Sequence, residues 1–248
     1  MTPDILVIRH GPVTELRFNR PAKKNAITGA MYDVLTATLS DAAADEGTRA
    51  VLITGEGDTF TAGNDIADFL ALSGQAEIPA TRFIHAIAAF PKPLVAAVGG
   101  PALGVGTTLL LHCDLVYAAP DARFAVPFVD LGLVPEAGSS MLLSRALGTH
   151  RASAMLLLGE AMDAQAAEAA GFVAVVPAGS LHAHALAAAA RLAAKPPAAL
   201  MASRALMRGD TEAVRAHMRL EEQAFATALA GPEARSAFSA FLNRRTPP

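Results

Sequence analysis

The chain has 248 residues and a formal net charge of −3, and 52% of its residues are hydrophobic while only 17% are charged. One cysteine, Cys113, excludes an internal disulfide and a cysteine-based metal cluster, and the lack of a basic run argues against nucleic acid as a partner. We find neither a signal-peptide pattern nor an apolar run of membrane-spanning length, so we expect a cytoplasmic protein. Because charged residues usually make up about 25% of a domain, their low share predicts surface buried against sister subunits.

Short apolar runs alternate with amphipathic segments over the first three quarters of the chain, which indicates an α/β fold. Gly11-Pro12 separates the first two runs and predicts a hairpin, and Thr28 is placed to cap the first helix. The predicted strands are 5–10, 13–19, 49–54, 94–98, 114–118, 122–126 and 172–176. The predicted helices are 28–44, 81–90, 141–147, 151–158, 163–170 and 180–194, with a short one after the segment 60–66.

The chain after Lys195 has a wholly helical pattern, with helices predicted at 198–207, 211–229 and 232–243. We therefore divide the chain into a core of residues 1–195 and a helical segment of residues 196–248. The last predicted helix carries Phe238, Phe241 and Leu242 but has little core of its own to cover. This pattern predicts that it docks on the main body or on a neighbouring subunit.

The predicted strand 94–98 is followed by four glycines within eight residues, which are Gly99, Gly100, Gly104 and Gly106. Such a cluster is typical of a turn in which the backbone comes close to another group, because any Cβ would be in the way. An apolar, buried helix is predicted to begin directly after it. The turn therefore leaves unpaired N–H groups at the positive end of a helix dipole, where a negative charge is favoured.

A second turn of the same kind is predicted in the segment FTAGNDI, residues 60–66, where Gly63 precedes Asn64 and Asp65. By itself the segment is equally consistent with an ordinary turn in which Asn64 or Asp65 caps a helix. If the backbone N–H groups of the two glycine turns point toward one position, they form an oxyanion hole.

Glu136 is the one carboxylate in an otherwise apolar and small-residue stretch, LVPEAGSS, residues 133–140. Burial in such surroundings raises the pKa of a carboxyl group toward that of a useful general base. The alternative is an exposed acid in the turn before a helix, where the helix dipole favours it.

Several common chemistries have no matching pattern in the chain. The sequence lacks a phosphate loop, a complete dinucleotide fingerprint, a Gly-x-Ser-x-Gly elbow and a His-Glu-x-x-His motif. The seven histidines are scattered, and His182 and His184 are two apart on a predicted helix, so we expect no metal site. His112 and Cys113, at the end of an apolar stretch, are interpreted as packing residues.

Three separated motifs in order make the chain similar to the enoyl-CoA hydratase/isomerase (crotonase) superfamily. They are FTAGNDI at 60–66, GGPALGVGTTLLLHCDLV at 99–116 and FVDLGLVPEAGSS at 128–140, and the likeness extends from the RPAKKNAI loop at 20–27 to the C-terminus. The resemblance implies an α/β, crotonase-like spiral of ββα units followed by a helical C-terminal region. It also implies a homotrimer or dimer of trimers and an acyl-CoA thioester substrate.

The resemblance implies that two backbone N–H groups meet the thioester oxygen. These are the N–H of Asn64, directly after Gly63, and the N–H of Val105, directly after Gly104. The same likeness implies that the substrate is contacted by Ala62, Gly63, Gly104, Phe128 and Leu131.

Departures from the family pattern indicate which reaction is catalysed. Hydratases of this family use two glutamates, and the matching positions here are Thr108 and Phe128, neither of which can replace a carboxylate. Glu136 instead resembles the single catalytic glutamate of the Δ3,Δ2-enoyl-CoA isomerases, a subgroup with pairs like Asn64-Asp65 and Pro127-Phe128. The resemblance therefore implies an isomerase that moves the double bond of a 3-enoyl-CoA to give the trans-2-enoyl-CoA.

The remaining expectations concern coenzyme A and the rival functions. Lys23 and Lys24 are candidates for contacting the CoA phosphates, as are Arg244 and Arg245, although all four can equally be solvated surface cations. No cofactor is expected, because coenzyme A is part of the substrate. The alternatives are a hydratase-like, thioesterase or decarboxylase reaction, for which Asp130 is a remote second group, and a non-catalytic acyl-CoA-binding paralogue.

Overall fold

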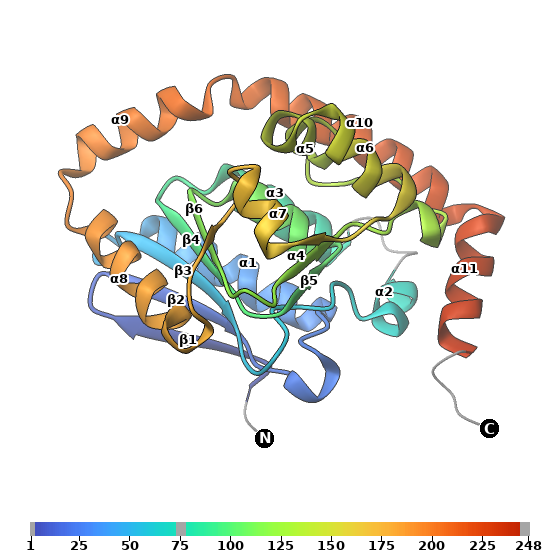
Figure 1. The fold of residues 1–248 in the computed structure, drawn as a ribbon, viewed down its shortest axis with the longest axis horizontal. Helices are drawn as coiled ribbons and strands as arrows, with labels where there is room; N and C mark the ends of the chain where they lie inside the picture. Colours follow the sequence, from blue (N-terminus) through green and yellow to red (C-terminus); the bar gives the residue numbers. More distant parts are fainter. Residues whose placement is uncertain (1–2, 73–77, 244–248) are drawn as a thin grey trace.

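The computed structural model describes residues 3–72 and 78–243, which form two sheets surrounded by helices (Figure 1). The larger sheet has the strand order β1-β2-β3-β4-β6-β9, and the smaller one has the order β5-β7-β8. The strands of the larger sheet are β1 (Ile5–His10), β2 (Val13–Phe18), β3 (Ala50–Gly55), β4 (Leu94–Val98), β6 (Leu115–Ala118) and β9 (Ala174–Val175). The smaller sheet contains β5 (Pro101–Leu103), β7 (Arg123–Ala125) and β8 (Met162–Asp163). Strands β1 and β2 form the predicted antiparallel hairpin, and β2, β3, β4, β6 and β9 run parallel to their neighbours.

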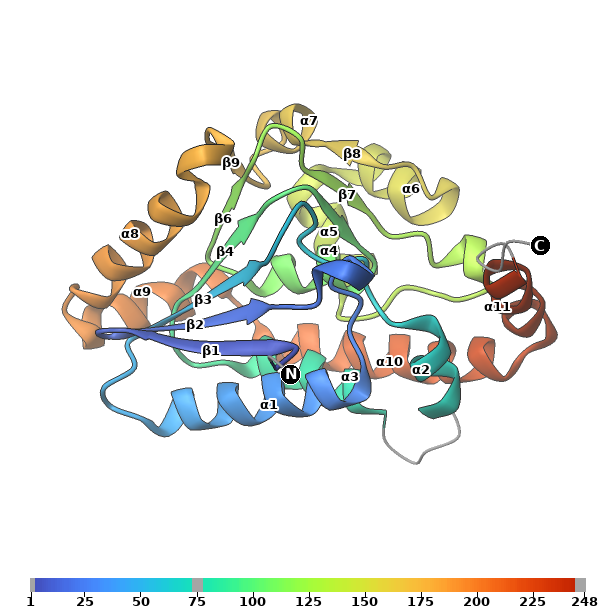
Figure 2. The same ribbon diagram turned by 90° about the horizontal axis from the view of Figure 1, so that it is seen from below.

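The larger sheet is covered on both faces, which explains why its strands are continuous apolar runs. One face packs on α1 (Gly29–Ala44) and α3 (Pro79–Ala89), and the other packs on α8 (Leu181–Ala193) (Figure 2). Within β3, Val51 and Ile53 belong to the main hydrophobic core, whereas Ala50 and Leu52 belong to a second cluster under α8. This alternation is the period of two expected of a strand.

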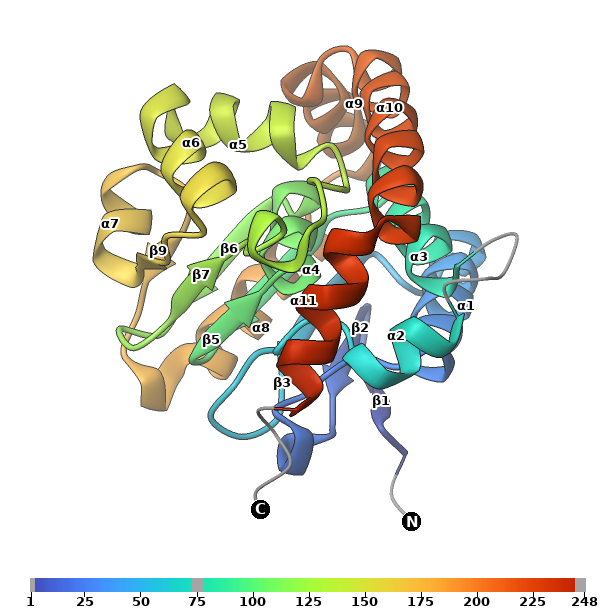
Figure 3. The same cartoon turned by 90° about the vertical axis from the view of Figure 1, so that its right-hand side faces the viewer.

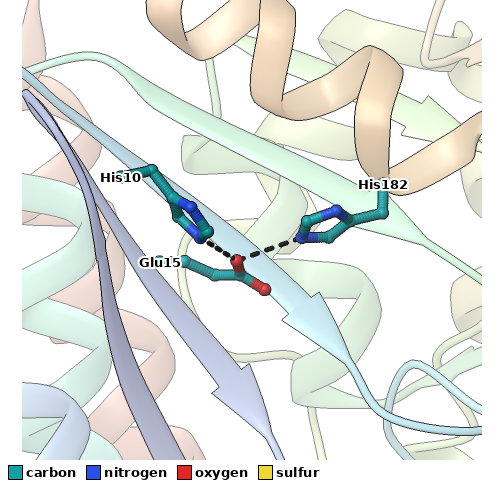
Figure 4. A group of neighbouring side chains, drawn as sticks. All are labelled: His10, Glu15 and His182. Atoms are coloured by element: carbon teal, nitrogen blue, oxygen red, sulfur yellow. Dashed lines mark hydrogen bonds and ion pairs between the residues drawn. The ribbon is translucent and has the colours of Figure 1, made fainter.

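A polar cluster joins the start of α8 to the hairpin (Figure 4). The fully buried Oε2 atom of Glu15 lies 2.8 Å from Nε2 of His10 and 3.0 Å from Nε2 of His182. Its other oxygen accepts hydrogen bonds from Arg17 and Thr54, each at 2.8 Å. Burial opposes the charge of Glu15, but these hydrogen bonds outweigh it and lower the pKa of the carboxyl group to about 2.

The remaining helices lie around the smaller sheet and along one side of the molecule. They are α2 (Ile66–Leu72), α4 (Val105–Thr108), α5 (Ser139–Leu147), α6 (Thr149–Leu158), α7 (Ala164–Ala169), α9 (Pro197–Arg208), α10 (Thr211–Ala230) and α11 (Pro232–Asn243). The described residues also form the 3-10 turns η1 (Pro21–Lys23), η2 (Leu109–His112), η3 (Val129–Leu131) and η4 (Ala178–Ser180). None of the helices between residues 3 and 243 that the model describes is both long and apolar enough to cross a membrane.

Helices α9 and α10 arch over the core, and α11 turns back across η3 and α2 (Figures 1 and 3). Phe238 of α11 is 2% exposed, and Phe225 of α10 packs edge-on against Phe69 of α2. The last helix thus docks on the main body of its own chain, as one of the two predicted alternatives. The side chains of Phe241 and Leu242 lie outside the described residues.

Most predicted elements are present within one to three residues of their predicted bounds, and the predicted cap at Thr28 is confirmed. Thr28 accepts a hydrogen bond from the N–H of Met31 at 3.3 Å, and Asp163 accepts one from Ala166 at 2.7 Å. The predicted apolar helix after the glycine cluster is different: one α-helical turn, α4, passes directly into the 3-10 turn η2. The strands β5 and β8 were not predicted, because segments of two or three residues carry no periodic signal.

Candidate active site

Glu136 lies in the turn before α5, with its side chain directed into the interior. The residue is 9% exposed, and its Oε1 accepts a short hydrogen bond from the hydroxyl group of Thr108. Its Oε2 is buried and has no hydrogen-bond partner among the residues described. Burial raises the pKa of Glu136 to about 8, the hydrogen bond from Thr108 lowers it, and the nearby charge of Glu221 raises it. The carboxyl group therefore has one oxygen held in place and one oxygen available to a ligand.

The turn that carries Glu136 is held from two sides. The Nε2 atom of His112 lies 2.9 Å from the carbonyl oxygen of Ala137. Burial lowers the pKa of His112 to about 4, so the ring is neutral and its Nε2–H donates to that oxygen. On the other side, the N–H groups of Gly138 and Ser140 donate to the carboxylate of Glu221, at 2.6 and 2.9 Å. His112 is thus a packing residue, as its position suggested, but with a defined hydrogen bond as well.

The two glycine turns lie side by side. A parallel bridge joins Thr61 to Ala102, with the N–H of Leu103 donating to the carbonyl oxygen of Thr61 at 3.0 Å. Two residues further on, a Cβ at Gly63 would stand 2.8 Å from the carbonyl oxygen of Leu103 and 3.9 Å from the Cα of Gly104. Both glycines have positive φ angles, +82° and +55°, which side chains disfavour. Only glycine lets the two backbones approach this closely.

The N–H groups that follow these glycines, those of Asn64 and Val105, have no acceptor in the described part of the chain. Three of the adjacent N–H groups are paired: Gly63 donates to Thr61 Oγ1 at 3.1 Å, Asp65 to the carbonyl oxygen of Ile27 at 2.9 Å, and Gly104 to the carbonyl oxygen of Ala125 at 2.8 Å. Because buried backbone donors are nearly always paired, two unpaired donors on adjacent turns are available to an external acceptor. An oxygen that gains negative charge is the group they would stabilise most.

Tyr32 on α1 contacts the turn that carries Asn64. Its hydroxyl group donates to Oδ1 of Asn64 at 2.5 Å, and burial together with the charge of Glu136 raises the pKa of Tyr32 well above its ordinary value. Tyr32 was not predicted as a site residue from the sequence. A small cavity opens beside Asn64, and its lining residues are mostly apolar: Ile27, Gly29, Tyr32, Asn64, Asp68, Phe69, Ile78, Pro79 and Ala80.

The other predicted substrate contacts occupy different environments. Phe128 is buried, whereas Ala62 and Leu131 are half-buried, the latter in η3. Lys23 and Lys24 are exposed in the 20–27 loop. The backbone of this loop contacts the site, because the N–H of Ala62 donates to the carbonyl oxygen of Lys24 at 2.9 Å.

This loop is fixed in place by an ion pair. Arg20 donates to the carboxylate of Asp65 at 2.8 Å, and it also donates to the carbonyl oxygen of Ala26. Burial would raise the pKa of Asp65, but hydrogen bonds, led by that from Arg20, lower it overall. The predicted contacts of Arg244 and Arg245 lie outside the described residues.

Two further acidic residues, Asp130 and Asp68, occupy different environments, and Asp68 is among the residues that line the small cavity beside Asn64. Asp130, the candidate for a second acidic group, is exposed. Its carboxylate lies against Gly159, so that a Cβ atom added at Gly159 would stand 2.5 Å from an oxygen of Asp130. Asp68 is half-buried and accepts a hydrogen bond from the N–H of Gly29 at 2.6 Å, so that it caps α1.

One group in the described residues has ligand atoms spaced as for a metal ion, namely His10, Glu15 and His182, within 4.8 Å of one another (Figure 4). The guanidinium group of Arg17 already compensates this carboxylate, and its Nη2 lies 3.3 Å from Nε2 of His182. A cation so close to two of the three atoms disfavours a second cation there. We interpret the group as the polar link between α8 and the hairpin.

Comparisons with known proteins show which proteins this chain resembles. The family model described as "Enoyl-CoA hydratase/isomerase" matches residues 9–248. The chain is 38% identical to 2,3-dehydroadipyl-CoA hydratase of Escherichia coli over 98% of this chain and 97% of that protein. It is 43% identical to enoyl-CoA delta isomerase 2 of Rattus norvegicus, over 68% of this chain but only 45% of that protein.

Solved structures are similar over nearly the whole chain. OdaA of Pseudomonas aeruginosa has a TM-score of 0.94 at 44% identity, covering 98% of this chain and 100% of that one. An enoyl-CoA hydratase/isomerase from Pseudoalteromonas atlantica has a TM-score of 0.92 at 42% identity, covering 99% of each chain. Fold and relatives define a crotonase-type acyl-CoA enzyme. The chain belongs to the enoyl-CoA hydratase/isomerase family.

Proposed function

We propose that the chain is an enoyl-CoA isomerase that converts a 3-enoyl-CoA into the trans-2-enoyl-CoA with Glu136 as its single acid–base group. The observation that carries this proposal is the buried Oε2 of Glu136, which has no partner among the described residues and lies on a carboxyl group with a pKa raised to about 8. A general base works best when its pKa is near the working pH.

The proposed reaction consists of two proton transfers. Glu136 removes a proton from carbon 2, and the electrons of that C–H bond delocalise onto the thioester oxygen to give a dienolate. The unpaired N–H groups of Asn64 and Val105 stabilise the negative oxygen. The protonated Glu136 then returns the proton to carbon 4, the double bond settles between carbons 2 and 3, and the thioester carbonyl is restored. Atoms and charge balance without a cofactor.

The surroundings of Glu136 support a single carboxylate. The two positions that correspond to hydratase glutamates hold Thr108, whose hydroxyl group is bonded to Glu136, and the buried Phe128. The nearby Glu221 is engaged with backbone N–H groups behind the turn. An apolar lining such as Phe128 also excludes water that would quench the dienolate.

Hydration of a 2-enoyl-CoA is the second candidate function, because the full-length relative from Escherichia coli carries the name of a hydratase. A hydratase must add a hydroxyl group and a proton to different carbons, so its active site has to position a water molecule as well as the base. We expect this activity to be absent or low here, since Thr108 and Phe128 offer no second carboxylate.

The test is the conversion of 3-hexenoyl-CoA to 2-hexenoyl-CoA by the wild type and by Glu136→Gln, with hydration of 2-hexenoyl-CoA measured on the same preparations. We expect isomerisation without substantial hydration, and a loss of about 10²-fold or more in the variant. Fast hydration with slow isomerisation would favour the hydratase. Binding of acyl-CoA without hydrogen exchange at carbon 2 in either protein would indicate a non-catalytic paralogue.

Coenzyme A is proposed to bind with its phosphates near the 20–27 loop. Lys23 and Lys24 are exposed there, and the loop backbone meets Ala62 beside the glycine turn. We also propose a cytoplasmic protein that assembles as a homotrimer or a dimer of trimers.

A further inference from the structure

Helix α10 directs a buried carboxylate at the turn behind Glu136. Glu221 is 7% exposed, and its Oε2 accepts the N–H of Gly138 at 2.6 Å. Its Oε1 accepts the N–H of Ser140 at 2.9 Å and the hydroxyl group of Ser140 at 2.5 Å. Both carboxylate oxygens are thus occupied by donors from a segment that lies 81 to 83 residues earlier in the chain.

Glu221 occupies a position where α10 otherwise presents apolar side chains. Val214, Met218 and Phe225 pack on the main core, and together with Glu221 they follow one face of the helix at spacings of four, three and four residues. A charge on this face is costly unless it is fully hydrogen-bonded. The N–H groups that compensate it belong to the first turn of α5, where the helix dipole also favours a negative charge.

The segment held by Glu221 adjoins the carboxylate of the site. Gly138 follows Glu136 by two residues, and the intervening Ala137 has a φ of +59°, a left-handed conformation that costs energy in a residue with a side chain. The N–H of Ser139 donates to the carbonyl oxygen of Glu136 at 3.0 Å. Such a turn persists only when its surroundings hold it, and Glu221 supplies the hydrogen bonds on its outer side.

We propose that Glu221 is a positioning residue, which holds the 136–140 turn so that the free oxygen of Glu136 faces the substrate. This inference rests on the proposed role of Glu136. It makes the helical C-terminal segment part of the active-site framework, although Glu221 itself does not touch the reacting atoms.

The charged and titratable groups around the turn are few in the described structure. His217, one turn earlier on α10, has its Nε2 2.7 Å from the hydroxyl group of Ser140 and 3.6 Å from Glu221. His112 faces the turn from η2, and burial together with the charge of Glu136 raises the pKa of Tyr32 on α1. Among the charged groups near the turn, Glu221 is the one whose negative charge raises the pKa of Glu136, because it disfavours a second negative charge nearby.

The experiment compares Glu221→Gln with Glu212→Gln, a control on the same helix whose exposed side chain bonds Arg219. The kcat and KM for 3-hexenoyl-CoA are measured across pH. In parallel, Glu136 is titrated directly by carbon-13 NMR of glutamate-labelled protein, its signal being identified by its loss in Glu136→Gln. For Glu221→Gln we expect kcat to fall about tenfold or more with KM little changed. We also expect the titration midpoint of Glu136 to move to lower pH.

A purely structural role would lower the stability of the variant but leave kcat of the folded protein unchanged. A folded Glu221→Gln protein with the wild-type kcat therefore overturns the inference. If that variant does not fold, Glu221→Asp retains the charge but is too short to reach both N–H groups, so kcat should fall while the midpoint changes little. An unchanged kcat in Glu221→Asp also overturns the inference. If the wild type does not isomerise, the proposed function fails, and the NMR titration still decides the effect of Glu221.

Discussion

At the scale of single residues, the site depends on how two carboxylates are buried. Glu136 has one oxygen bonded to Thr108 and one without a partner in the described residues, whereas Glu221 has both oxygens bonded. An unsatisfied buried oxygen costs stability, so its presence points to a ligand. The burial of Glu136 could be predicted from the sequence, because this residue is the one acid in an otherwise apolar and small-residue stretch. Glu221 could have been suspected as the one acid on the apolar face of α10, but its partners lie far away in sequence.

The pH dependence of the proposed reaction follows from the raised pKa of Glu136. The base must be ionised, so kcat/KM should rise with pH and level off above about pH 8. The hydrogen bond from Thr108 lowers this pKa, and Thr108→Val removes it, so the rising limb should shift to higher pH. We expect about a tenfold lower kcat/KM near pH 7. A pH–rate profile of the two proteins measures the shift, and an unshifted profile would argue against Glu136 as the titrating base.

Backbone donors cannot be removed by changing their own side chains, so the oxyanion hole is tested through Gly63. A Cβ there would stand 2.8 Å from the carbonyl oxygen of Leu103, at a φ of +82°. We expect Gly63→Ala to lower kcat/KM by about 10² or more, the cost of losing one such donor. Gly148→Ala is the matched control, because its φ is +78° but its Cβ would meet no atom within 4 Å. Equal activity losses in the two variants would mean that strain alone is responsible.

Among the secondary-structure elements, most strands and helices could be predicted from apolar runs and capping residues in the sequence. The run 49–54 was recognisable as a strand because a sheet covered on both faces needs apolar residues at every position. The smaller sheet was missed because its strands are short and are specified by pairing partners elsewhere in the chain. The approach of the two glycine turns could be expected from their shared pattern. By contrast, the link from Tyr32 to Asn64 depends on how α1 packs, which the local sequence does not specify.

The link between α8 and the hairpin gives a prediction about stability. The pKa of Glu15 is about 2 in the folded protein, so its ionised form contributes stability at neutral pH that is lost as pH falls from about 4.5 through 2. Glu15→Gln should reduce the free energy of unfolding by about 3 kcal/mol at pH 7, because Arg17 loses its buried partner. Urea unfolding at neutral pH and near pH 3 measures the difference, which should shrink as the pH falls. A difference independent of pH would contradict the account of this cluster.

At the scale of the whole molecule, the low charge content points to assembly. Large apolar side chains are exposed on the monomer, including Leu206 at 83% and Met207 at 88% on α9, and Leu157 and Leu158 on α6. We expect a homotrimer or a dimer of trimers in solution, since soluble monomers rarely expose contiguous apolar patches. Light scattering coupled to size-exclusion chromatography gives the mass. The double variant Leu206→Asp, Met207→Asp should dissociate the assembly if α9 lies at the interface, and a monomeric wild type would contradict the expectation.

We propose that the carboxyl group of Glu136 carries a proton from carbon 2 to carbon 4, and isotope transfer between these carbons is a direct test of this step. The substrate is 3-hexenoyl-CoA with two deuterium atoms at carbon 2, and the product of the first turnovers is analysed by mass spectrometry and NMR. The account predicts that part of the product carries deuterium at carbon 4, and that Glu136→Gln abolishes both the transfer and the conversion. Product with only solvent hydrogen at carbon 4, or full conversion by Glu136→Gln, would show that the two protons are handled by other groups.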